Sequence, residues 1–165
     1  MSSPPARQLS SDLEELPPGL QNRLVLFRLL ITIGGRLQAR MDGQLADLGI
    51  TTQQATFLHL ASTAQRPPSL GEVAQVMGST HQNARQLAEA LVRKGLLEIV
   101  VDPRDRRVRR MVPTPKSAEL WAARNPTEHA QVASWFAALD DAQVEQALAL
   151  LQPLALGLCP PRPRP

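Results

Sequence analysis

Residues 69–116 read SLGEVAQVMGSTHQNARQLAEALVRKGLLEIVVDPRDRRVRRMVPTPK, and this stretch decides the fold. Ser69 and Glu72 have the spacing of a capping box, in which each side chain satisfies a backbone N–H group at a helix start. Apolar residues then recur every three or four positions, and Gly78 suits the left-handed backbone that ends a helix. A new helix start follows at once. Two helices joined by a tight turn that contains glycine predict a helix-turn-helix.

The second of these helices carries apolar residues on one side and base-reading side chains on the other. Ser79 has the spacing of a capping box with Gln82, Thr80 is a rival cap, and Gly95 closes the helix. Gln and Asn pair with adenine, Arg pairs with guanine, and the first turns of such a helix enter the major groove. On this helix alone, a solvated polar face is an equally good interpretation. The candidate DNA contacts are Ser79, Thr80, His81, Gln82, Asn83, Arg85 and Gln86.

The next segment favours DNA binding. Residues 96–101 and 108–112 predict two strands, and DPRDRR (102–107) is a turn sequence between them. An arginine-rich hairpin suits a narrow minor groove, where the negative potential is enhanced. A charged run is usually only a solvated face, but directly after a helix-turn-helix it predicts a wing. We expect Asp102 and Asp105 to orient the turn by bonding its backbone or an arginine. The wing candidates for DNA contact are Arg104, Arg106, Arg107 and Arg109, and Arg110 completes five arginines in seven residues.

The charge of the chain is concentrated in this region. Residues 79–116 hold nine Lys and Arg against four Asp and Glu, a net charge of +5, whereas the rest of the chain holds nine against eleven, which is −2. A positive charge confined to the expected reading surface is the electrostatic footprint of a nucleic-acid-binding protein.

Three short motifs resemble one particular family. Lys94-Gly-Leu-Leu97, Asp102-Pro-Arg-Asp-Arg-Arg107 and Thr114-Pro-Lys116 resemble the MarR family of winged-helix transcriptional regulators. The resemblance implies a wing-tip Arg107 in the minor groove, held by Asp105. It also implies groove contacts from His81, Gln82, Arg85 and Gln86. The chain departs from the family at four positions, because the family usually has Gly at Ser117 and apolar residues at Ser79, Arg110 and Pro113.

The flanking segments predict helical arms. Residues 1–18 and 159–165 read as flexible tails, and residues 49–113 as the winged helix-turn-helix domain, which begins with a helix from Thr52 to about Ala64. Residues 19–48 predict one long helix with an apolar stripe, which Gly34-Gly35 should weaken or bend. Residues 114–158 predict two helices. Thr114 caps the first, and Asn125-Pro126 must kink or break it. Asp140 and Gln143 mark the start of the second.

We therefore expect a mainly α fold with a small β-hairpin wing, in which residues 19–48 and 114–158 form the dimerisation region. Their apolar faces have no second core to cover, and the resemblance likewise implies a two-fold dimer. Its two recognition helices would read a pseudo-palindrome in successive major grooves, about 34 Å apart. A small molecule that changes this spacing is the switch that the resemblance implies. The residues that could line its pocket are Arg23, Arg28, His59, Trp121 and Trp135, and the sequence favours none of them.

Other functional classes are less well supported. His59, His81 and His129 share no metal-ligand spacing, and we expect neither a metal nor a cofactor. The family's peroxide sensors have a reactive cysteine early in the first long helix, whereas this chain has only Cys159, in a tail. No phosphate-binding loop, H-E-x-x-H or nucleophile elbow indicates an enzyme. No signal peptide or membrane-spanning run is present, which predicts a cytoplasmic protein without a membrane partner.

Two functions remain. The first is a sequence-specific, dimeric transcriptional regulator that binds double-stranded DNA and responds to an unidentified effector. The family that the chain resembles mostly represses, so the resemblance implies a repressor. The second is an architectural or protein-binding winged helix without a small-molecule switch. Exposed Gln82, Arg85 and Gln86 disfavour a purely protein-binding role.

Overall fold

The computed structural model describes residues 13–158, apart from the side chains of 123–126. The chain divides into two compact units, residues 1–52 and residues 53–165. Most of the two predicted tails, residues 1–12 and 159–165 with Cys159, lies outside the described residues.

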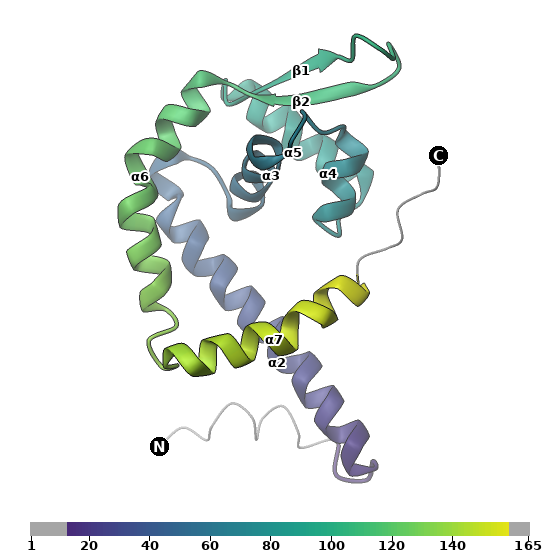
Figure 1. The fold of residues 1–165 in the computed structure, drawn as a ribbon, viewed down its shortest axis with the longest axis vertical. Coiled ribbons are helices and arrows are strands. Elements are labelled where there is room, and N and C mark those ends of the chain that lie inside the picture. Colours follow the sequence, from purple (N-terminus) through teal and green to yellow (C-terminus); the bar gives the residue numbers. More distant parts are fainter. Residues whose placement is uncertain (1–12, 159–165) are drawn as a thin grey trace. The chain divides into compact units, whose positions relative to one another are not determined.

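In the first unit, the predicted long helix is helix α2, Pro18–Gln44, followed by the 3-10 helix η1, Ala46–Leu48 (Figure 1). The α-helix is thus shorter than expected, and Gly49 ends η1 with a φ of 62°. Helix α2 continues through Gly34 and Gly35, and a Cβ atom at either position would meet nothing within 4 Å among the described residues.

The helix-turn-helix lies in the second unit, where helix α3, Thr52–Thr63, precedes helices α4, Leu70–Val76, and α5, His81–Arg93. The predicted capping box is present: Ser69 N–H donates to Glu72 Oε2 at 2.6 Å, and Glu72 N–H donates to Ser69 Oγ at 3.2 Å. Gly78 ends the α4 region with a φ of 60°. Thr80, the rival candidate, caps α5 because its Oγ1 accepts the N–H of Asn83. The predicted box between Ser79 and Gln82 is therefore wrong.

A two-stranded antiparallel hairpin follows, formed by β1, Leu97–Val101, and β2, Arg109–Pro113. Each strand begins one residue later than predicted, and Pro113 occupies the last position of β2, opposite Leu97. A proline has no N–H to donate to the ladder of hydrogen bonds. At the end of a strand this missing donor interrupts no further pairing, so proline is tolerated there. Ser69 forms an isolated bridge with Arg110, and Met111 N–H donates to the carbonyl of Pro68 at 2.8 Å. This pairing of the hairpin with the segment before α4 was not predicted.

The hairpin and the helix-turn-helix share a core. Helix α4 packs on α5 and on β2, and α5 packs against β1. The largest side chains with almost no exposure in this unit are Phe57, Leu58, Val73, Leu91, Leu97 and Met111. The wing is therefore anchored through apolar side chains of both strands.

Helix α6, Pro115–Ser134, and helix α7, Asp141–Leu158, complete the second unit (Figure 1). The predicted caps are present, because Thr114 Oγ1 accepts the N–H of Ser117 and Asp140 and Gln143 bond each other reciprocally. Helix α6 continues through Asn125-Pro126, so of the two predicted outcomes, a kink or a break, the break is wrong. An interior proline costs a helix about 3 kcal/mol, because it removes one backbone hydrogen bond, but the residues on both sides of Pro126 remain helical. None of the helices in the described part is long and apolar enough to span a bilayer.

Candidate nucleic-acid interface

Helix α5 presents its predicted contact residues as one exposed polar face. Ala84, Leu87, Ala88 and Leu91 are buried. Because these four positions share one side of the helix, the opposite side faces solvent. The exposed candidates are Thr80, His81, Gln82, Arg85 and Gln86. Ser79 and Asn83 are half-buried and bond each other, Asn83 Nδ2 donating to Ser79 Oγ at 2.8 Å. Their hydrogen bond links the residue before the cap to the first turn of α5.

Arg85 has a local partner that was missed from the sequence. Its Nε donates to Glu89 Oε1 at 2.8 Å, and the two side chains are 72% and 46% exposed. Their spacing, four residues on a helix, is a signal that would have revealed the pair. Such exposed pairs contribute only about 0.3–0.5 kcal/mol, so Arg85 remains available to a competing acceptor.

Asp102 organises the wing turn. Its Oδ1 accepts the N–H groups of Arg104 at 2.7 Å and Asp105 at 3.3 Å, and its Oδ2 accepts Arg110 Nε at 2.6 Å. The backbone N–H of Arg104 and the Arg110 guanidinium lower the pKa of Asp102 from its ordinary value of 3.8. Asp105 Oδ1 accepts the backbone N–H of Arg107 at 2.9 Å. Both aspartates thus shape the turn, and Asp105 does so through the backbone of Arg107.

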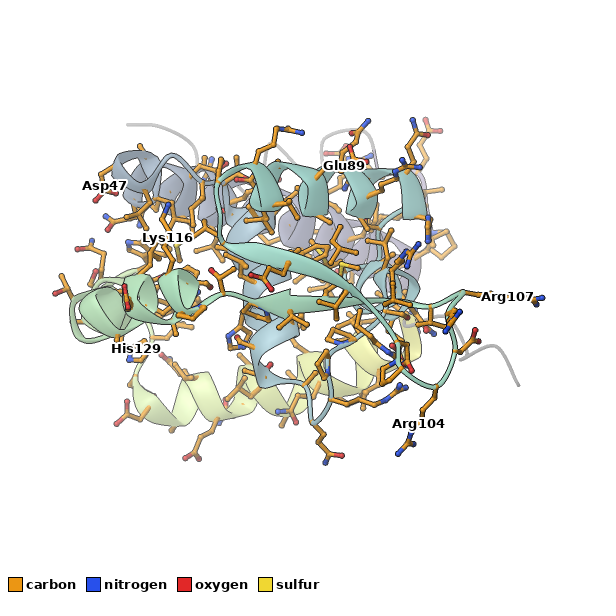
Figure 2. All side chains as sticks on the ribbon, turned by 90° about the horizontal axis from the view of Figure 1, so that it is seen from above. Asp47, Glu89, Arg104, Arg107, Lys116 and His129 are labelled. Carbon is orange, nitrogen blue, oxygen red and sulfur yellow. The ribbon has the colours of Figure 1, made fainter. Side chains whose placement is uncertain are left out.

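Four arginines of the wing point outward. Figure 2 shows Arg104 and Arg107 extending away from the hairpin end. The side chains of Arg104, Arg106, Arg107 and Arg109 are exposed, and within the described part of the chain none forms an ion pair with a carboxylate. Unpaired guanidinium groups at a hairpin tip can neutralise phosphates without first breaking an internal contact.

Two of the basic residues in this region instead serve the fold. Lys94 Nζ donates to Gln54 Oε1 at 2.7 Å, and Lys116 Nζ donates to the carbonyl of Lys94 at 3.0 Å. Thr114 Oγ1 donates to the carbonyl of Gly95 at 2.8 Å. The start of α6 therefore satisfies carbonyl groups at the end of α5, where a helix lacks its own donors. The described residues hold no cluster of three or more His, Cys, Asp or Glu that could bind a metal ion.

Helices α4 and α5, joined by a tight turn and followed by the β1–β2 hairpin, form a winged helix-turn-helix. Residues 48–108 match the model of the MarR family, so the resemblance seen in the sequence is confirmed for the winged part of the chain. The described helices and hairpin together have the fold of MarR-family transcriptional regulators. The predicted fold class, mainly α with a small β-hairpin wing, is confirmed. No curated protein matches the sequence.

Solved structures extend the likeness beyond the winged part. BldR, a transcriptional regulator from Sulfolobus solfataricus, is 19% identical with a TM-score of 0.76, covering 87% of this chain and 100% of BldR. The MepR–DNA complex of S. aureus is 23% identical with a TM-score of 0.69, covering 79% and 96%. CouR from Rhodococcus jostii bound to p-coumaroyl-CoA is 24% identical with a TM-score of 0.69, covering 82% and 93%. BldR is described as a transcriptional regulator, and the MepR structure is described as a complex with DNA.

Proposed function

We propose that the protein is a transcriptional repressor that binds a pseudo-palindromic operator as a homodimer and is released by a small molecule. The observation that carries the DNA-binding part is the pairing of two exposed surfaces on one unit. Helix α5 presents His81, Gln82, Arg85 and Gln86, and the hairpin presents exposed arginines that form no ion pair within the described part of the chain. The first set suits base edges in the major groove, and the second suits phosphates and the minor groove.

Exposed apolar side chains support the dimer. On α2, Phe27 and Ile31 are 61% and 64% exposed, and on α7, Leu150 and Leu156 are each 76% exposed. Exposed apolar patches mark interaction sites. The open space beside Gly34 and Gly35 would also permit a close approach by a second helix. A second copy of the chain would bury these residues and place two recognition helices about 34 Å apart.

The effector is inferred from one relative and one local observation. CouR is described as bound to p-coumaroyl-CoA. Within the described residues, Trp121 Nε1 and Glu128 Oε2 of α6 are buried without a hydrogen-bond partner. Two turns of one helix separate them, so they share a face. Because buried polar atoms are almost always satisfied, a bound molecule with an acceptor and a donor would account for both.

The test is fluorescence anisotropy with a duplex from upstream of the protein's own gene and a scrambled duplex, at about 0.15 M salt. We expect tight binding to the first duplex only, with two chains per duplex by analytical ultracentrifugation. Equal, weak binding to both duplexes would instead support the architectural or protein-binding alternative. Addition of p-coumaroyl-CoA, with free coenzyme A as the control, begins the screen for release of the DNA.

A further inference from the structure

Arg110 differs from the other wing arginines because its guanidinium group points inward. Its side chain is only 15% exposed. Arg110 Nε donates to Asp102 Oδ2 at 2.6 Å, and Nη1 donates to Glu72 Oε2 at 3.1 Å. Asp102 belongs to the turn of the hairpin, whereas Glu72 lies in the first turn of α4. One guanidinium therefore joins the wing to the helix-turn-helix body.

Both carboxylates are held from more than one side. Glu72 Oε2 also accepts the N–H of Ser69, and its Oε1 accepts Arg66 Nη2 at 2.7 Å. Burial raises the pKa of Glu72, but the hydrogen bonds from Ser69 and the two guanidinium groups outweigh it, so the pKa is lowered overall. Two arginines and two acids thus form a neutral network, called here the wing clamp: Arg66, Glu72, Asp102 and Arg110.

The wing has a mechanical need for such a clamp. An isolated two-stranded hairpin is marginally stable at best. The apolar anchor of β2 is Met111, next to Arg110, and the far end of the hairpin extends beyond this core. A wing whose direction drifts has to be ordered again on the DNA before its arginines make their contacts, and this ordering lowers the affinity without removing a phosphate contact. Charge-assisted hydrogen bonds fix direction as well as distance, which apolar contacts do not.

We propose that Arg110, through Glu72 and Asp102, is a positioning residue that sets the direction of the wing for DNA binding and does not itself contact DNA. The proposal rests on the proposed DNA-binding function. It divides the five arginines of the hairpin into four that face DNA and one that aligns them. A contact between Arg110 and a phosphate would require the guanidinium to leave two carboxylates, one of them only 12% exposed.

The first test compares Arg110→Met with Arg109→Met, which removes the same charge from the neighbouring exposed position. Anisotropy is measured on the preferred duplex between about 0.05 and 0.2 M salt. We expect Arg110→Met to weaken binding about tenfold at every salt concentration, with an unchanged slope of log affinity against log salt. We expect Arg109→Met to lower that slope by about 0.9 per chain. A slope lowered equally by Arg110→Met would make Arg110 a phosphate contact and overturn the proposal.

In the second test, the positioning role predicts the opposite of what charge alone predicts. Removing a carboxylate from a DNA-binding surface normally strengthens binding, and Glu98→Gln, on the exposed side of β1, is the matched control. Because Glu72→Gln loosens the wing clamp, we expect weaker binding in spite of the lost negative charge. The double variant Glu72→Gln/Arg110→Met should lose less than the sum of the single losses. Strengthened binding by Glu72→Gln, as for the control, would refute the positioning role.

Hydrogen exchange separates this proposal from the proposed function. The N–H groups of Arg104 and Asp105 are bonded to Asp102, so Arg110→Met should accelerate their exchange in the free protein, whether or not DNA binds. A folded Arg110→Met variant with unchanged exchange in the turn would overturn the wing clamp. Failure of the native protein to prefer its duplex, with accelerated exchange in the variant, would overturn the DNA-binding function alone.

Discussion

Arg107→Ala tests the wing most directly, because the structure places this arginine at the turn without a carboxylate partner in the described part of the chain. Each phosphate neutralised contributes about 0.9 to the slope of log affinity against log salt. A dimer has two wings, so the variant should lower the slope by about 1.8. Relative to 1 M salt, that slope corresponds to a loss of about 30-fold at 0.15 M and about 200-fold at 0.05 M.

The assay is anisotropy on the preferred duplex at several salt concentrations, with Arg107→Lys as the control that keeps the charge. Arg107→Lys should retain most of the slope, because a lysine also neutralises a phosphate. The turn itself should survive the change to alanine, since Asp105 bonds the backbone N–H of residue 107 and not its guanidinium. An affinity loss of the same size at every salt concentration would show that Arg107 does not neutralise a phosphate.

Three further changes and one pH series probe the recognition helix and its supports. Gln86→Ala should cost about 1–3 kcal/mol on the preferred site and relax the base preference, measured on duplexes with single base changes; an equal loss on every sequence would reduce Gln86 to a phosphate contact. Leu91→Ala, at a position with no exposure, should lower the free energy of unfolding by about 2–5 kcal/mol in urea titrations. Thr114→Ala should cost about 1–2 kcal/mol in the same assay, because it removes the α6 cap and the bond to the end of α5; no loss would mean that water replaces both. The pKa values of Glu72 and Asp102 are lower in the folded protein than their ordinary values of 4.5 and 3.8. The two carboxylates therefore stabilise the fold at a pH above these ordinary values, and this contribution is lost as the pH falls through the lower folded pKa values. Thermal denaturation should therefore show their effect below about pH 4.5, and a loss confined to higher pH would contradict it.

Much of the fold could be predicted because its signals are local. The capping boxes at Ser69 and Asp140 and the left-handed turns at Gly78 and Gly95 depend on residues within a few positions of one another. Backbone sterics and the unsatisfied N–H groups of a helix start act over this range, so the residue order reveals them. The exposed face of α5 follows in the same way from helical periodicity.

The errors arose where two local signals compete. Ser79 and Thr80 both suit a helix start, and the observed start at His81 decides for Thr80, because the cap is the residue directly before the first helical residue. Pro126 has a local cost, but α6 continues on both sides of it.

Only the tertiary structure shows which arginines are exposed and which one is bonded to carboxylates of the fold. From the sequence, Arg110 is one of five arginines within seven residues, and its neighbour Arg109 has the same charge. Folding brings Glu72, 38 positions earlier in the chain, to 3.1 Å from Arg110 Nη1. Lys94 is likewise bonded to Gln54, 40 positions away. Periodicity and charge indicate, from the order of residues alone, which side chains could face DNA. Tertiary packing decided which of them are retained by the fold, because an ion pair between distant segments exists only after both have docked on the shared core.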